Sequence, residues 1–124
     1  MTIISKNKLN ILLISVHEQI NSSSTFLDKI TDALYYHDCS GVVVHEGSLP
    51  NAFFDLKTGL AGEILQKCSN YGIKMAIVGD FGKYRSKSLR AFIAESNNGN
   101  RVFFKDSLED GIHAISNPVH HGNV

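Results

Sequence analysis

Hydrophobic residues change their spacing several times along this chain, and each change predicts a new element of secondary structure. Residues 9–16 (LNILLISV) are almost continuously apolar and branched, which is typical of a strand buried on both faces. After a polar turn, apolar residues recur every three or four positions from Phe26 onward, which predicts a helix over 25–37. Thr25, with Asp28 three residues later, resembles a capping box at the start of this helix.

The middle of the chain repeats this order of strand and helix. Residues 42–46 predict a second buried strand, because three consecutive valines are stiff at χ1 and favour the pleated state. After a loop that contains Pro50, an apolar face predicts a second helix over 58–70, and Gly72 is well placed to end it. Residues 73–78 then predict a third core strand.

The two ends of the chain carry shorter signals. Residues 86–96 predict a third helix and residues 101–104 a short strand. A last helix is expected to begin at Ser107, although Gly111 inside it lowers its intrinsic stability. The weak alternation over residues 1–5 fits a strand at the edge of a sheet.

Alternating strands and helices imply parallel pairing through right-handed crossovers. We therefore expect an α/β fold with a mixed sheet of four or five strands and helices packed against it. The length of 124 residues suits one domain. We assign residues 1–116 to that domain and expect residues 117–124 to form a disordered tail.

Charge and hydropathy exclude several classes of function. Basic and acidic residues number 12 each, so the formal net charge is zero, which argues against nucleic-acid binding. We interpret the four basic residues between 83 and 90 as a solvated face. No apolar run reaches the roughly 18 residues that a membrane span needs, and the signal-peptide pattern is missing. We therefore expect a cytoplasmic protein without a membrane partner.

Recognisable catalytic and ligand-binding motifs are also missing from the sequence. It contains no P-loop, no dinucleotide fingerprint, no nucleophile elbow and no zinc-protease motif. Cys39 is expected in a turn and Cys68 on the apolar face of the second helix, and neither has a histidine at ligand spacing. We expect no metal and no cofactor, and two thiols suited to a reducing compartment.

Polar residues gather where predicted strands end and predicted helices begin. Ligands of open α/β sheets bind at this edge, and a helix N-terminus offers free N–H groups and the positive end of its dipole to an anion. A helix cap explains Asp55 or Thr58 equally well, and a turn explains Asp80. The candidate binding residues are Glu46, Asp55, Lys57, Thr58, Gly59, Asp80 and Ser86.

Residues 42–80 resemble STAS (anti-sigma-factor antagonist) domains in layout. A buried strand leads to a Phe-Asp turn, then to a Thr-Gly-Leu helix start, a helix, and a strand that ends at Gly-Asp. In STAS domains a partner kinase phosphorylates a serine or threonine at that helix start. The resemblance implies a STAS-like fold and phosphorylation at Thr58, which precedes Gly59 and Leu60.

A second and denser resemblance covers residues 53–104. Long runs within FFDLKTGLAGEILQKCSNYGIKMAIVGDF and SKSLRAFIAESNNGN are similar to a family of small bacterial proteins that share a domain of unknown function. This resemblance is specific, because long runs of residues agree, but it brings no known activity.

Three hypotheses on function follow. The first is a non-enzymatic regulatory module that binds a protein partner at the start of the second helix, where a phosphate on Thr58 would add about 1.5 to 2 negative charges. The alternative is a small-molecule or anion-binding protein, or an enzyme, with the candidate residues around a pocket. The third is a homo-oligomer that associates through exposed Phe53, Phe54 and Phe81.

Overall fold

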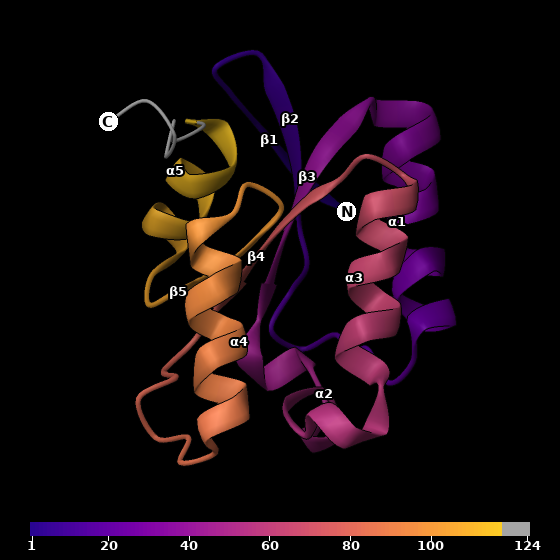
Figure 1. The fold of residues 1–124 in the computed structure, drawn as a ribbon. Helices are drawn as coiled ribbons and strands as arrows, with labels where there is room; N and C mark the ends of the chain where they lie inside the picture. Colours follow the sequence, from indigo (N-terminus) through magenta and orange to yellow (C-terminus); the bar gives the residue numbers. More distant parts are fainter. Residues whose placement is uncertain (118–124) are drawn as a thin grey trace.

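A five-stranded sheet runs through the middle of the molecule, with its strands in the order of the sequence (Figure 1). This computed structural model describes residues 1–117, so the expected tail lies, apart from its first residue, outside the described residues. The first two strands are antiparallel and the rest pair in parallel, which confirms the predicted α/β fold with a mixed sheet. The strands are β1 (Thr2–Lys6), β2 (Leu9–Leu13), β3 (Cys39–His45), β4 (Lys74–Val78) and β5 (Val102–Lys105).

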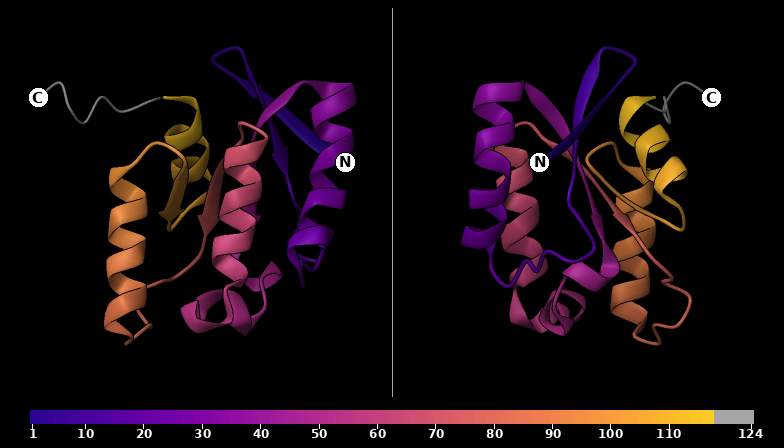
Figure 2. Two further views of the ribbon diagram at one scale, coloured as in Figure 1. Left: turned by 45° about the vertical axis from the view of Figure 1, so that its right-hand side comes forward. Right: turned by 180° about the vertical axis from the view of Figure 1, so that it is seen from behind.

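Helices cover both faces of the sheet (Figure 2). α1 (Ser23–His37), α3 (Leu60–Asn70) and α4 (Lys87–Asn98) pack on one face, and α5 (Leu108–Ser116) packs on the other. Successive side chains of a strand point to opposite faces, so the buried strands supply apolar residues to both layers. The two cores that result are separate clusters, the smaller of which lies beneath α5.

Gly111 has a packing role that the sequence did not indicate. A Cβ at this position would lie 3.2 Å from side-chain atoms of Ala76 and Val78 on β4. A glycine therefore lets α5 approach the sheet closely, which offsets its low helix propensity.

Several predicted boundaries in the first third of the chain are wrong. Ser22 rather than Thr25 caps α1, since its hydroxyl accepts a hydrogen bond from the Thr25 amide at 3.1 Å. The predicted strand over 9–16 ends at Leu13, and the Ile14 amide makes one more bond to the Val43 carbonyl of β3. Cys39 is not in a turn but is the buried first residue of β3.

The segment before the second predicted helix is more ordered than expected. The sequence predicts a loop over residues 47–54, the segment that contains Pro50. The chain instead forms the 3-10 turn η1 (Glu46–Ser48) and the short helix α2 (Asn51–Phe54). A second 3-10 turn, η2 (Leu56–Thr58), precedes α3. The predicted helix start at Thr58 is wrong because Gly59, at φ +80°, has a left-handed conformation that separates η2 from α3.

Candidate functional site

The turn η1, which directly follows β3, lies between two other segments at the carboxyl edge of the sheet. Residues 14–20 leave β2 on one side of it, and the loop over 79–85 leaves β4 on the other. The turn makes polar contacts to both: Ser48 bonds to the first segment and Glu46 to the second. The carboxyl edge predicted from sequence is therefore a connected set of loops.

The carboxylate of Glu46 accepts hydrogen bonds from three donors of the loop over 79–85. One oxygen lies 2.7 Å from Lys83 Nζ and 2.6 Å from the Tyr84 hydroxyl. The other oxygen accepts from the Asp80 amide at 3.1 Å. Gly79 makes this approach possible, because a Cβ there would lie 2.5 Å from the Glu46 side chain.

The electrostatics of this cluster favour an ionised Glu46. Its side chain is only 15% exposed, and burial by itself would raise the pKa of the carboxyl. The hydrogen bonds from Lys83, Tyr84 and the Asp80 amide outweigh that effect and hold the pKa below its usual value. Burial, with the adjoining carboxylate, raises the pKa of the Tyr84 phenol. At neutral pH the pair is therefore a carboxylate and a neutral phenol.

Aromatic rings surround this hydrogen-bonded cluster. The ring of Phe54, on α2, stacks on Tyr84 with centroids 5.0 Å apart and planes at 15°. Phe81 lies 6.3 Å from Phe54 and packs edge-on against Phe104 at 5.2 Å. Phe54 and Phe81 are half-buried against the larger core, so these rings are less exposed than the oligomer hypothesis assumed.

Phe53 departs furthest from expectation, because it is 1% exposed and belongs to the larger core. Phe53 is the buried residue of α2, in a segment for which a loop was expected. Phe53 is therefore buried within the chain and is not part of an exposed aromatic surface.

The candidate residues before α3 form a closed turn. The Thr58 hydroxyl lies 2.5 Å from the Ala52 carbonyl oxygen and 2.9 Å from that of Asp55, and it accepts from the Leu60 amide at 3.3 Å. The Asp55 carboxylate caps η2 by accepting from the Lys57 amide at 3.3 Å. These side chains therefore act on their own backbone, as turn and cap residues do.

The structure brings together part of the predicted site. Glu46 and Asp80 meet through the Asp80 amide, and the turn before α3 reaches them through the stacked ring of Phe54. Ser86 caps α4 by accepting from the Leu89 amide at 3.2 Å. Sequence reasoning missed Tyr84, although an aromatic residue among basic ones after a strand end was a visible signal.

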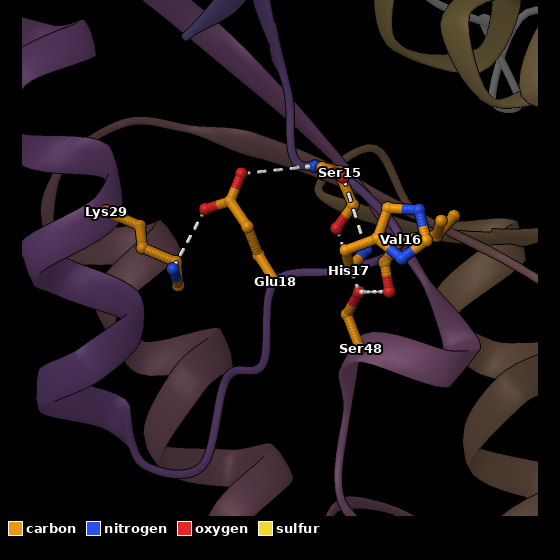
Figure 3. A network of polar contacts seen from close by, with 6 residues as sticks. All are labelled: Ser15, Val16, His17, Glu18, Lys29 and Ser48. Atoms are coloured by element: carbon orange, nitrogen blue, oxygen red, sulfur yellow. Dashed lines mark hydrogen bonds and ion pairs between the residues drawn. The ribbon is translucent and has the colours of Figure 1, made fainter.

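On the other side of η1, a second network holds the segment after β2 (Figure 3). Ser48 is fully buried, and its hydroxyl contacts the carbonyl oxygens of Ser15 at 3.2 Å and Val16 at 3.4 Å. Glu18 accepts from the Ser15 amide at 3.3 Å and pairs with Lys29 of α1 at 2.9 Å. The Lys29 hydrogen bond holds the pKa of Glu18 below its usual value. Both sides of the turn are thus fixed by polar contacts.

Three cations follow the aromatic Tyr84 in the sequence, at the start of α4. Arg85, Lys87 and Arg90 are exposed, and within residues 1–117 none of them is in an ion pair. They flank the first turn of α4, which contains no acidic residue. Positive side chains at the positive end of a helix dipole repel it, so this arrangement is locally unfavourable.

The described residues contain no obvious metal centre. Among residues 1–117 no group of three histidine, cysteine or acidic side chains is arranged to hold a metal ion. An open hollow of about 440 Å³ lies beside the ends of β4 and β5, with Asp80, Asp106 and Asp110 in its wall. In the same part of the chain, every helix is too short or too polar to cross a membrane.

Comparison with known proteins identifies the family. A family model described as a domain of unknown function, DUF4180, matches residues 6–115, and the chain belongs to this family. This confirms that residues 53–104 belong to a domain of unknown function, as their resemblance implied. No curated protein and no solved structure matches the chain.

Proposed function

We propose that this chain is a non-enzymatic protein-interaction module of the cytoplasm that binds an acidic segment of a partner protein. The contact surface, which we call the loop face, consists of the loop over 79–85, the first turn of α4 and the ring of Phe54. The engagement of Glu46 with three donors is the observation that carries this proposal.

A general acid or base needs a pKa near the working pH and access to the proton it transfers. The Glu46 carboxylate has a lowered pKa, and both of its oxygens already accept hydrogen bonds from the loop. It therefore supports the conformation of the loop, which is what a binding surface requires. A loop held in its bound conformation loses less entropy when a partner docks.

The chemistry of the loop face indicates the kind of partner. Arg85, Lys87 and Arg90 lie at the start of α4, where a negatively charged segment would relieve their repulsion with the helix dipole. The half-buried rings beside them offer apolar contact, and aromatic and arginine residues are enriched at protein interfaces. We therefore expect the partner to present acidic and apolar side chains together.

The regulatory part of the proposal rests on the STAS-like layout of residues 42–80. Phosphorylation of Thr58 would remove the proton that its hydroxyl donates to the Ala52 and Asp55 carbonyls. The turn before α3 would then open, and Phe54, which connects this turn to the loop face, would shift. Such a change would alter the partner's affinity.

An NMR titration tests the proposal. The probe is a short peptide of glutamates interrupted by one phenylalanine, added to the isotopically labelled protein. We expect saturable shifts in the amides of residues 79–90 that weaken with salt, because the contact is largely electrostatic. The same peptide with lysines in place of glutamates should leave these amides unchanged.

A pair of charge-matched variants controls for net charge. Arg85→Gln with Lys87→Gln should weaken peptide binding about five- to tenfold, since exposed charge contacts each contribute up to about 1 kcal/mol. Lys67→Gln with Lys74→Gln removes the same charge from the opposite end of the sheet and should leave affinity unchanged. If both pairs of substitutions weaken peptide binding equally, the loop face is not a binding site. The same conclusion follows if the peptide shifts amides near lysines and arginines throughout the chain.

A further inference from the structure

The hairpin turn between β1 and β2 determines which backbone groups of β1 face outward. Asn7 and Lys8 both have positive φ, at 51° and 68°, and Lys6 pairs with Leu9 across this two-residue loop. Such a turn closes on a hydrogen-bonded pair, and bonded and non-bonded pairs alternate from there. The N–H and C=O groups of residues 2, 4 and 6 thus face β2, while those of residues 3 and 5 face away from the sheet.

These outward groups are open to another strand. Within residues 1–117, no hydrogen bond is made to the backbone N–H or C=O of Ile3 or Ser5 on their outer side. β1 also lacks the proline and the bulge with which proteins protect their edge strands. The opposite edge differs, because Asn97 Oδ1 accepts from the Phe104 amide of β5 at 2.7 Å. Within the described residues, one outward amide of β5 is thus occupied, whereas the outward groups of Ile3 and Ser5 are not.

An apolar groove runs beside the open edge. α5 packs over β3, β4 and β5, and leaves Ile4 of β1 and Ile112 of α5 only partly buried. Leu108 is 39% exposed at the same place. The hollow between β1 and α5 has a volume of about 680 Å³, and Lys6 and Glu109 give its wall charges of both signs.

We propose that two copies of this chain pair through β1, antiparallel, about a two-fold axis at Ile4. In this register the outward groups of Ile3 in one copy meet those of Ser5 in the other, so all of them are satisfied. Ile4 faces Ile4 of the second copy as a non-hydrogen-bonded pair, whose Cα atoms approach to about 4.5 Å. The Ile4 side chains of both copies lie on the face of the sheet that carries the groove. Each of them covers apolar surface in the groove of the other copy.

The occupant is a second copy because this surface is complementary to itself. A two-fold interface requires each patch to match its own image, and Ile3 and Ser5 lie symmetrically about Ile4 along β1. The groove carries the basic Lys6 as well as the acidic Glu109 and Asp110, and the chain as a whole has no net charge, so no overall repulsion keeps two copies apart. This edge is distinct from the loop face, and the inference does not depend on the proposed function.

A proline substitution tests the backbone pairing. Ser5→Pro removes an outward N–H and keeps the backbone bonds to β2, and prolines are tolerated at such positions. It also loses the side-chain bond from the Ser5 hydroxyl to Asn10 of β2. Ser5→Ala is the matched control, since it loses the same hydroxyl and keeps the N–H. By sedimentation velocity, we expect the wild type and Ser5→Ala to have the mass of a dimer and Ser5→Pro that of a monomer. Circular dichroism should show unchanged secondary structure in all three.

Two charged substitutions at Ile4 test the same pairing of β1 strands, even if Ser5→Pro fails to fold. Ile4→Lys and Ile4→Glu should each be monomeric, because like charges would face each other across the axis. Mixing the two variants should restore the dimer mass.

The proposal is overturned if the wild type sediments as a monomer at every protein concentration measured. It is also overturned if all of the variants remain dimeric. It is equally overturned if only deletion of residues 118–124 produces the dimer, which would show that the chain's own end occupies the edge.

Discussion

Replacing Tyr84 by phenylalanine removes one atom from the cluster around Glu46 and leaves the rest in place. The ring keeps its stack on Phe54, so the substitution removes the hydroxyl that donates to the carboxylate at 2.6 Å. A hydrogen bond to a charged group contributes about 1.5 to 3 kcal/mol. Glu46 retains Lys83 and the Asp80 amide, so we expect the loss of stability to lie lower, at about 1 to 2 kcal/mol.

The assay is urea unfolding followed by circular dichroism, with thermal unfolding as a second measurement. For a chain of this length the unfolding entropy is roughly 0.26 kcal/mol/K, so the expected loss lowers Tm by about 4 to 8 °C. Tyr36→Phe is the matched control, because this tyrosine is 79% exposed. Its unfolding free energy should change by less than about 0.5 kcal/mol.

The effect of Tyr84→Phe should depend on pH in a defined direction. The folded-state pKa of Glu46 is lowered, so its contribution is complete above the unfolded pKa, near 4.3, and is lost as pH falls through the folded value. The pKa of Tyr84 is raised, so its contribution is complete below the unfolded value, near 10. The difference between wild type and variant should therefore be largest near neutral pH. Equal stabilities at pH 7, or a difference that does not narrow at low pH, would refute this account of the cluster.

Three further predictions follow from the packing, two around the turn η1 and one in α3. Gly79→Ala should lower the unfolding free energy by about 1 to 3 kcal/mol, because the new methyl group would lie 2.5 Å from Glu46, whereas Gly47→Ala meets no atom within 4 Å and should be nearly neutral. Ser48→Ala should cost about 1 kcal/mol in urea unfolding, since a fully buried hydroxyl is lost, and an unchanged midpoint would contradict its role. Burial raises the pKa of Cys68 to about 12, so mass spectrometry should find it alkylated at pH 8 only in urea, and rapid native labelling would contradict its burial.

The order of the elements could be predicted from sequence because each depends on local spacing. The three valines of β3 predict a strand and the apolar stripe of α3 predicts a helix, each from a few neighbouring residues. The sequence also predicted that Glu46 and Asp80 lie at the same edge of the sheet, because parallel strands place their carboxyl ends together.

Exact ends of elements were less predictable, because they depend on competition between neighbouring groups. Ser22 and Thr25 are both good caps, and the hydrogen bond between them, rather than either residue type, decides where α1 begins. Gly59 marks the end of η2 through a positive φ that many other residues would avoid. The short helix α2 has no apolar period long enough to reveal it.

The sequence by itself determined an α/β domain whose polar residues gather at one edge, because periodicity and strand direction are properties of the local chain. Only the tertiary structure decided that Tyr84 meets Glu46, 38 residues away, that Phe53 is buried, and that β1 pairs antiparallel with β2 at the edge of the sheet. These facts depend on how distant segments fill space and satisfy each other's polar groups, and no local pattern contains that information.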